Sequence, residues 1–202
     1  MDLVLVRHAL PVRVVTEGGV ADPPLSELGH RQAAAAAEWL SGEKFDALYA
    51  SPLLRARETA APFAKALGLE VQIEEGIAEY DRMSEAYIPI EEVKKSDDPE
   101  IQAHWKALAE DRLEDLIADA HTFRPRVAEA TERLIANHAG QSVLAVCHGG
   151  VICAALAEVI GLQRTLWFEA GYASIHRIVA SSRAGIRSIK SINEMGHLRG
   201  IE

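Results

Sequence analysis

Chemically versatile side chains follow three short apolar runs that lie far apart in the chain. They are Arg7 and His8 after the first run, Arg55 after the second, and His148 and Gly149 after the third. Arginine binds phosphate through two N–H donors, and a neutral imidazole can attack phosphorus when its other nitrogen donates to a backbone carbonyl. A second, protonated imidazole would stabilise the charge that develops on the phosphoryl oxygens. If these side chains converge, they form a site for phosphoryl transfer.

The apolar runs predict the strands that would bring these side chains together. Residues 3–6, 45–50 and 142–147 have the short, apolar and partly β-branched composition of buried strands. A further strand is expected at 71–73. In open α/β sheets, ligands bind in the crevice outside the carboxyl ends of the strands. We therefore expect the arginines and histidines to meet at one edge of a sheet.

Helix signals alternate with these strands. Ser26 predicts the N-cap of a helix over 27–40, and Ser51 predicts the N-cap of a helix that starts at Pro52 and ends at Leu67. Three more helices are expected: one from Asp98-Pro99 with Ile101, Trp105, Leu108 and Leu116 on one face, one from Arg124-Pro125, and one over 150–160. The alternation of strand and helix implies an α/β sheet with helices on both faces.

The last two predicted strands, 173–180 and 186–192, are joined by a turn at 182–185 with no helix between them. An antiparallel edge is therefore expected. Residues 80–97 have no clean period and are expected to be irregular. The predicted fold class is α/β, a three-layer α/β/α arrangement with a mostly parallel central sheet and a helical insert over the active site.

Composition narrows the class of protein. The chain has 202 residues and a formal net charge of -9, which suits one domain over 1–202 and disfavours a nucleic-acid partner. Its two cysteines, Cys147 and Cys153, are too few for a disulfide framework and are expected to be reduced and buried. No apolar stretch reaches the roughly 18 residues of a membrane span, and the N-terminus lacks the positive charge of a signal peptide. We expect a cytoplasmic protein without a membrane partner.

Three motifs occur in order along the chain: LVRHA at 5–9, SPLLRARETA at 51–60 and CHGGVI at 147–152. Together they resemble the motifs of the histidine phosphatase superfamily, the phosphoglycerate-mutase-like enzymes that work through a phosphohistidine intermediate. Further matches are DPPLSELGHRQA at 22–33 and, near the end, Asn193 with GHL at 196–198. The resemblance spans nearly the whole chain.

The resemblance implies a role for each matched position. His8 would be the nucleophile and His148 the group that stabilises the transition state. The phosphate-binding residues would be Arg7, Arg55, His148 and the Gly149 backbone. The general acid of the family usually follows the third strand, where Glu79 fits best and Asp81 is the alternative. No metal and no cofactor are implied.

Some positions depart from the family pattern. Pro11 and Val14 stand where many members carry auxiliary phosphate ligands, so those contacts are absent or come from elsewhere, with Arg13 as a candidate. The Glu-Arg-x-Tyr-Gly signature of the mutases is missing, which favours hydrolysis over isomerisation. Arg57 is expected at the surface, and Trp39 and the other two tryptophans are expected to pack in the core or lid.

We therefore expect a metal-independent phosphatase that acts on a small phosphorylated metabolite through a phosphohistidine on His8. Three alternatives stay open: a phosphoglycerate-mutase-type phosphotransferase, a protein phosphohistidine or phosphotyrosine phosphatase, and a catalytically weak module that binds a phosphate ligand. The sequence identifies neither the substrate nor the oligomeric state.

The negative charge is concentrated in one segment. Residues 74–119, the expected insert, contain 15 acidic and 5 basic residues, whereas the rest of the chain has a net charge of +1. A lid of this sign would slow the approach of highly charged anions, and salt would screen the effect.

Overall fold

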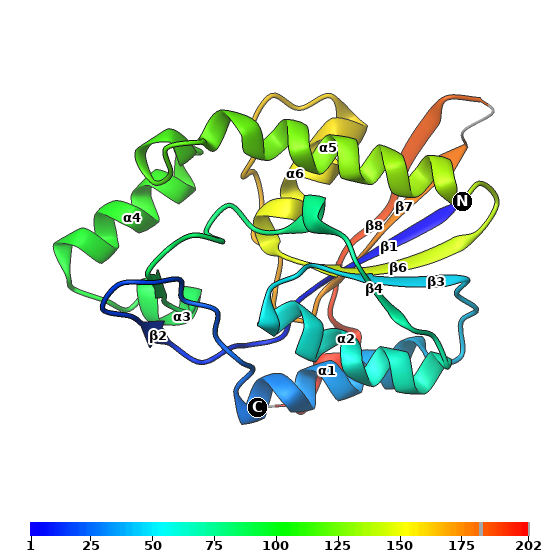
Figure 1. Ribbon diagram of the computed structural model, residues 1–202, viewed down its shortest axis with the longest axis horizontal. Helices are drawn as coiled ribbons and strands as arrows, with labels where there is room; N and C mark the ends of the chain where they lie inside the picture. Colours follow the sequence, from blue (N-terminus) through cyan, green and yellow to red (C-terminus); the bar gives the residue numbers. More distant parts are fainter. Residues whose placement is uncertain (182–183, 202) are drawn as a thin grey trace.

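β1 (Asp2–Arg7) lies inside a six-stranded sheet in the computed structural model, which describes residues 1–181 and 184–201 (Figure 1). The strand order is β4–β3–β6–β1–β7–β8. The other strands have these bounds: β3 Ala47–Ala50, β4 Val71–Ile73, β6 Ser142–Cys147, β7 Ile175–Ser181 and β8 Ile186–Glu194. The first four strands in this order pair in parallel, whereas β7 is antiparallel to both β1 and β8. The predicted parallel sheet with an antiparallel edge is confirmed.

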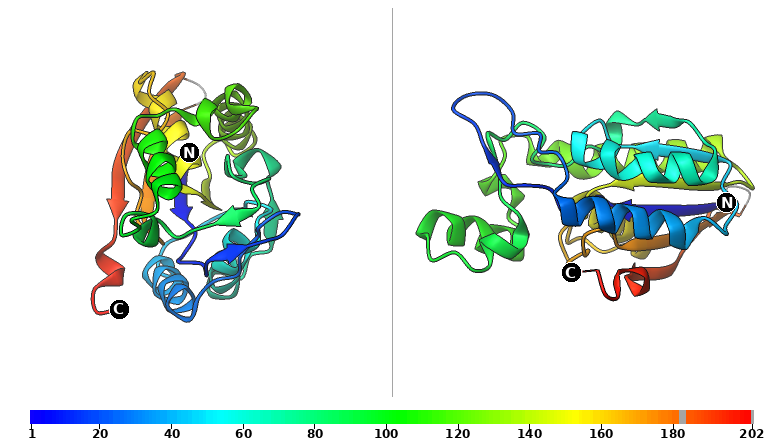
Figure 2. Two further views of the ribbon diagram at one scale, coloured as in Figure 1. Left: turned by 90° about the vertical axis from the view of Figure 1, so that its left-hand side faces the viewer. Right: turned by 90° about the horizontal axis from the view of Figure 1, so that it is seen from below.

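Alternate side chains of β1 enter two different apolar cores. Leu3 and Leu5 pack in the core beneath α5 and α6, and Val4 and Val6 pack in the core beneath α1 and α2. The four helices have these bounds: α1 Glu27–Leu40, α2 Leu54–Leu67, α5 Ala120–Asn137 and α6 Gly149–Ile160. Successive strand side chains point to opposite faces, so a strand that is apolar throughout needs cover on both. Figures 1 and 2 show the resulting three layers.

Two predicted N-caps have different outcomes. Ser26 caps α1, since its Oγ accepts the N–H of the residue three positions later at 3.0 Å. Ser51 does not cap α2, because that helix begins at Leu54 and the Ser51 hydroxyl is hydrogen-bonded to His148 at 2.7 Å. The carboxylate of Asp22 accepts the Leu54 N–H instead, at 2.8 Å. Ser51 keeps a local contact, since its hydroxyl accepts the Leu53 N–H at 3.3 Å, but the helix begins later than predicted.

Two further helix bounds differ from prediction. α5 starts at Ala120 rather than at Arg124-Pro125, and Pro125 lies inside the helix. Phe123, buried in the first turn of α5, gives those extra residues an anchor in the core. α4 (Pro99–Ala109) starts as predicted, with Asp98 as its N-cap, but it ends before Leu116.

The insert, residues 74–119, lies beyond the carboxyl ends of the parallel strands (Figure 2). Its elements are η1 Glu75–Ile77, β5 Ala86–Tyr87, α3 Ile90–Val93, α4 and η2 Leu113–Asp115. β5 pairs antiparallel with β2 (Val14–Val15) from the first loop. Residues 80–97 are thus less irregular than expected, because a short strand and one helical turn lie within them.

The remaining expectations about the chain concern its end and its cysteines. The turn expected at 182–185 falls partly outside the described residues, and Ala184 and Gly185 are turn residues. Cys147 and Cys153 are buried free thiols, as expected. Among the helices of the described residues, none is both long and apolar enough to cross a bilayer.

Candidate active site

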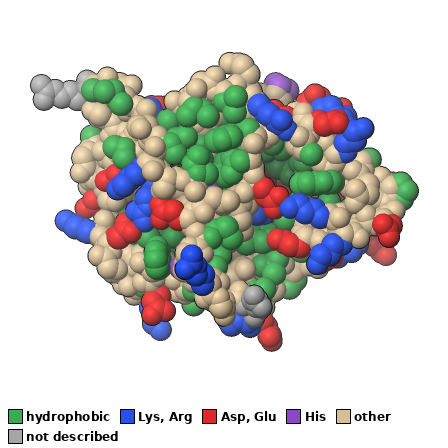
Figure 3. All heavy atoms as spheres, turned by 180° about the vertical axis from the view of Figure 1, so that it is seen from behind, with side chains coloured by type: hydrophobic (Ala, Val, Ile, Leu, Met, Phe, Trp, Pro, Cys, Tyr) green, Lys and Arg blue, Asp and Glu red, His purple; other side chains and the backbone are tan. Residues whose placement is uncertain are grey.

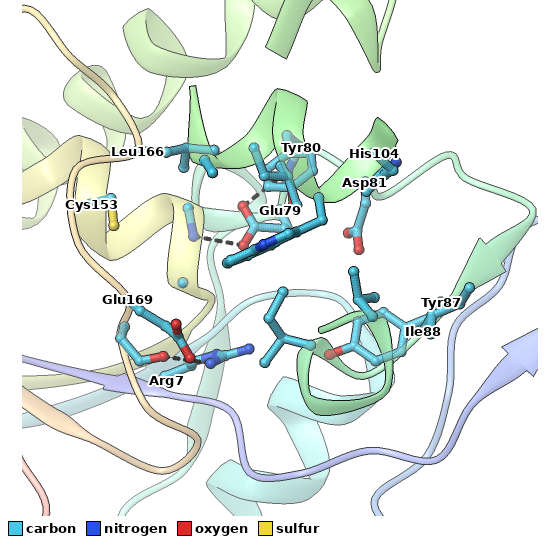
Figure 4. A pocket seen from close by; sticks show the side chains of 18 of the residues that line it. Arg7, Glu79, Tyr80, Asp81, Tyr87, Ile88, His104, Cys153, Leu166 and Glu169 are labelled. Atoms are coloured by element: carbon cyan, nitrogen blue, oxygen red, sulfur yellow. Dashed lines mark hydrogen bonds between the residues drawn. The ribbon is translucent and has the colours of Figure 1, made fainter. Parts of the chain in front are cut away.

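A cavity of about 510 Å³ opens at the carboxyl ends of the parallel strands, beneath the insert (Figure 4). Of the predicted site residues, it is lined by Arg7, His8, Arg55, Glu79 and Gly149. They come from the end of β1, the start of α2, the segment after η1 and the start of α6. The structure therefore brings these five together.

His148, at the end of β6, is not among the residues that line the cavity. It is fully buried beside His8, with the two ring centroids 5.0 Å apart. The second histidine thus lies against the first.

The backbone just after β1 fixes the tautomer of His8. Its Nδ1 donates to the carbonyl of the next residue, Ala9, at 2.9 Å, so the lone pair lies on Nε2. Burial and the neighbouring guanidinium groups of Arg55 and Arg7 hold the pKa of His8 well below its usual value. The ring is therefore neutral at pH 7, in the form that a nucleophile requires.

The guanidinium groups of Arg7 and Arg55 are positioned by different partners. Arg7 donates through Nη1 to the carbonyl of Ala170 at 2.5 Å, and its guanidinium carbon lies 3.8 Å from the ring centre of Tyr172. Arg55, only 1% exposed, donates through Nη2 to Asp81 at 2.8 Å and lies over the ring of Tyr87. In the described part of the chain, the buried Nε atoms of both arginines have no hydrogen-bond partner. The site thus offers unused donors to an oxyanion.

The protonation of His148 differs from the sequence expectation. Burial, with the charges of Arg55 and Arg7, lowers its pKa well below the usual value, so the ring is neutral rather than protonated. Its Nε2 is hydrogen-bonded to the hydroxyl of Ser51 at 2.7 Å. Its Nδ1 is buried and has no partner among the described residues. When Ser51 donates to Nε2, the proton lies on Nδ1 and a neutral ring still offers one N–H donor.

Glu79 lies against the N-terminus of α6 and is 6% exposed. Its carboxylate accepts the N–H of Gly150 at 2.8 Å and that of Tyr80 at 3.1 Å. Burial, followed by the charge of Asp81, raises the pKa of Glu79 to about 7. A carboxyl group with this pKa can both give and take a proton near neutrality.

The segment that carries Glu79 is clamped by neighbouring elements. Arg126 of α5 donates to the carbonyls of Gly76 and Ala78 at 2.9 Å each. A Cβ placed on Gly150 would lie 2.5 Å from a carboxylate oxygen of Glu79. The glycine at that position is thus required for the carboxylate to approach the helix.

Glu79 and Asp81 have different surroundings. Asp81 is ion-paired with Arg55 at 2.8 Å, whereas burial favours the neutral form of Glu79. Figure 4 shows both carboxyl groups at the cavity, with Glu79 on the side of α6.

Sequence reasoning missed several residues around the site. Tyr87 of β5 faces Arg55, and Tyr172, from the loop before β7, faces Arg7. Neither segment has a sequence period that would have revealed these tyrosines. Thr59 lies within a motif that the sequence analysis quoted, and its hydroxyl accepts the Ala9 N–H at 3.0 Å.

Other sequence expectations about single residues have mixed outcomes. Arg13 is not among the described residues that line this cavity, and it is paired with Glu92 at 3.4 Å. Arg57 is exposed, as expected. Trp39 is 56% exposed, so the expected packing is wrong for that residue. Trp105 and Trp167 line the cavity.

The side chains of the described residues form no cluster of the kind that binds a metal ion. Throughout residues 1–181 and 184–201, no three His, Cys, Asp or Glu side chains cluster in a way that could hold one. The polar groups of the cavity floor are cationic or neutral donors, together with one buried carboxyl group, a combination that suits an anion.

Comparisons with known proteins agree with this geometry. A model of the histidine phosphatase superfamily (branch 1) matches residues 3–194. Phosphoserine phosphatase 1 from Hydrogenobacter thermophilus is 32% identical over 186 residues, which cover 87% of this chain and 86% of that protein. The uncharacterized phosphatase PhoE from Bacillus subtilis is 29% identical over 188 residues, 90% of this chain and 88% of that protein. Three mycobacterial proteins, 28% identical over 191 residues, are matched along only 50% of their own length.

Solved structures share the fold. A mutant phosphoserine phosphatase from Entamoeba histolytica, in complex with phosphoserine, has a TM-score of 0.72 at 24% identity, and 98% of each chain is covered. Mycobacterial glucosyl-3-phosphoglycerate phosphatase has a TM-score of 0.69 at 21% identity, with 96% of this chain and 99% of that chain covered.

Proposed function

The chain belongs to the histidine phosphatase superfamily (branch 1), and we propose that it hydrolyses a small phosphomonoester through a phosphohistidine on His8. The observation that carries the proposal is the hydrogen bond from His8 Nδ1 to the Ala9 carbonyl, since it leaves Nε2 as the nucleophilic atom beside two buried arginines. Two of its relatives, phosphoserine phosphatase 1 and PhoE, are named as phosphatases, which supports hydrolysis over isomerisation.

In the first step, Arg7 and Arg55 bind the phosphoryl oxygens through their free N–H groups. His8 Nε2 then attacks phosphorus, an N–P bond forms, and the P–O bond to the alcohol breaks. The protonated carboxyl group of Glu79 gives its proton to the departing alkoxide. His148 donates from Nδ1 to a phosphoryl oxygen, where negative charge increases in the transition state. Gly149, at the first turn of α6, lies beside Arg7, and its backbone N–H would add a donor.

In the second step, the roles of the same groups are reversed. The Glu79 carboxylate takes a proton from a water molecule, whose oxygen attacks phosphorus while the N–P bond breaks. Inorganic phosphate leaves, His8 is again neutral, and Glu79 is again protonated. Because the two arginines balance the phosphoryl charge throughout, the cycle as proposed uses no metal ion.

Steady-state hydrolysis of a panel of phosphomonoesters, with EDTA present, tests the proposal. We expect His8→Ala to lower kcat by about a thousandfold or more, because the covalent route is lost. His30→Ala, which removes an exposed histidine from α1, is the matched control and should keep full activity. Full activity in a folded His8→Ala protein would refute the proposed mechanism.

A further inference from the structure

The cavity has two chemically different regions. Its floor carries the arginines, His8 and Glu79, whereas most side chains of the wall away from the floor are apolar. The apolar wall comes from α4 and from the segment after α6: Ile101, Trp105, Leu108, Leu166, Trp167 and Phe168. Figure 3 shows a hollow with hydrophobic side chains inside and charged side chains around it.

The spacing of the α4 residues turns them toward the cavity together. Ile101, Trp105 and Leu108 are separated by four and three residues, so they share one face of the helix. All three are only partly buried, and all three line the cavity. An apolar stripe that would normally enter a core is thus available to a ligand.

Among the described residues of the lining, the cation besides Arg7 and Arg55 already donates to two backbone carbonyls. Apart from Arg7 and Arg55, Arg164 is the remaining Lys or Arg in the described lining. Its guanidinium is already bound to the carbonyls of Leu166 and Ala109.

The carboxylates of the lining oppose an acidic substrate further. Asp81, Glu100 and Glu169 all border the cavity. Lys94, which is adjacent to this wall, is paired with Glu169 at 2.5 Å. A substrate carboxylate would meet like charge here, and the further arginine of the described lining, Arg164, is held by two backbone carbonyls.

We propose that the substrates are phosphomonoesters of apolar, uncharged alcohols, of aryl or medium alkyl size, rather than phosphorylated amino or sugar acids. This substrate class rests on the proposed phosphatase function. The cavity volume, about 510 Å³, exceeds what a phosphate group alone needs and falls in the usual range of small-molecule sites. Burial of the alcohol against Trp105 and its neighbours would supply binding energy remote from the reacting phosphorus.

The test is kcat/KM for ethyl, butyl and hexyl phosphate, compared with phosphoserine and 3-phosphoglycerate. The alkyl esters have leaving groups of nearly equal basicity, so differences report burial of the chain. We expect a rise of about two- to fourfold per added methylene, and hexyl phosphate to exceed both acidic substrates by more than tenfold, as the transfer free energy of a methylene implies. A flat alkyl series, or a preference for phosphoserine or 3-phosphoglycerate, would overturn the inference while leaving the phosphatase function intact. Absence of hydrolysis for every ester would instead refute the proposed function.

Variants of the apolar wall test whether its side chains cause the preference for longer alkyl esters. Trp105→Ala should lower the hexyl-to-ethyl ratio of kcat/KM by about tenfold, since a large apolar contact is lost. Trp39→Ala, which removes an exposed tryptophan away from the cavity, should leave the ratio unchanged. Ile101→Lys should lower that ratio and raise relative activity on 3-phosphoglycerate, because it adds a cation to the apolar wall. An unchanged ratio in both wall variants would contradict the assignment.

Discussion

His8 and Glu79 have pKa values that are shifted in opposite directions by the same buried site. Burial penalises the charged form of each, so the pKa of the imidazole falls and that of the carboxyl group rises to about 7. At neutral pH the nucleophile is therefore unprotonated, while a large share of the acid keeps its proton. The proposed first step requires this pair of states.

The shifted pKa of Glu79 predicts the pH profile. Because the acid must be protonated to act, kcat/KM for alkyl phosphates should fall by about tenfold per pH unit once the pH exceeds about 7. This fall is the alkaline limb of the profile. An acidic limb, in which kcat/KM falls because His8 becomes protonated, should appear only well below pH 6.5, since the pKa of His8 is lowered. Initial rates across the pH range measure both limbs.

Variants assign the alkaline limb to one carboxyl group. Glu79→Gln should lower kcat for alkyl esters by about 10²- to 10⁴-fold and remove the limb. Asp81→Asn is the control: it should keep the limb and move it to lower pH, because the charge of Asp81 helps to raise the pKa of Glu79. If the Asp81 variant lost the limb and the Glu79 variant kept it, the two roles would have to be exchanged.

At the scale of elements, the start of α6 is what positions the acid. Gly150→Ala adds a methyl group 2.5 Å from Glu79 Oε1 and 3.0 Å from a ring carbon of Tyr80. The carboxyl group must then move, so kcat for alkyl phosphates should fall by about tenfold or more. The fold itself should persist, because alanine suits a helix better than glycine does.

Gly42→Ala provides the matched comparison, since no atom lies within 4 Å of the added Cβ. Its kcat and its Tm should equal those of the parent protein. Equal kcat in the Gly150 variant would show that Glu79 does not need its contact with α6.

The elements that the sequence predicted correctly are those whose signals are local. Buried strands and the Ser26 cap depend on neighbours within a few residues, and the structure confirms them. Ser51 has the same local signal, but its hydroxyl is bound by a histidine 97 positions away. The start of α5 was misplaced because the buried ring of Phe123 stabilises turns that Pro125 would otherwise exclude.

The convergence of the site residues followed from topology, whereas their surroundings did not. Three parallel strand ends necessarily meet at one edge, so Arg7, His8 and His148 could be placed together from the sequence. The position of Tyr87, and the use of the α4 stripe as a cavity wall, depend on how the insert folds back over that edge. Tyr172 comes from the loop between α6 and β7. The hydrophobic periodicity of a short segment does not predict such long-range placement.

At the scale of the whole molecule, the charge is divided between two regions. The insert, with its net charge of -10, lies over the cavity, and the remaining chain is nearly neutral. Substrates must therefore pass an acidic surface before they meet the two arginines. Coulomb repulsion of this kind extends over a Debye length, about 8 Å at physiological ionic strength.

This division predicts the effect of salt. For a bisphosphate, kcat/KM should rise as NaCl is added, because screening weakens repulsion by the insert more than it weakens the buried contacts with the arginines. For an alkyl phosphate, which carries a single phosphate group, kcat/KM should change less with salt. A steep fall for the bisphosphate would mean that attraction by the arginines dominates its approach.

The covalent intermediate on His8 is the central claim, and trapping it is the most direct test. A reaction with ³²P-labelled alkyl phosphate is quenched in alkali within one turnover, and the labelled peptide is identified. We predict an acid-labile, alkali-stable phosphoryl group on the peptide that contains His8, forming and decaying no more slowly than kcat. Rapid hydrolysis without a phosphorylated His8, or with the label on another residue, would contradict the account.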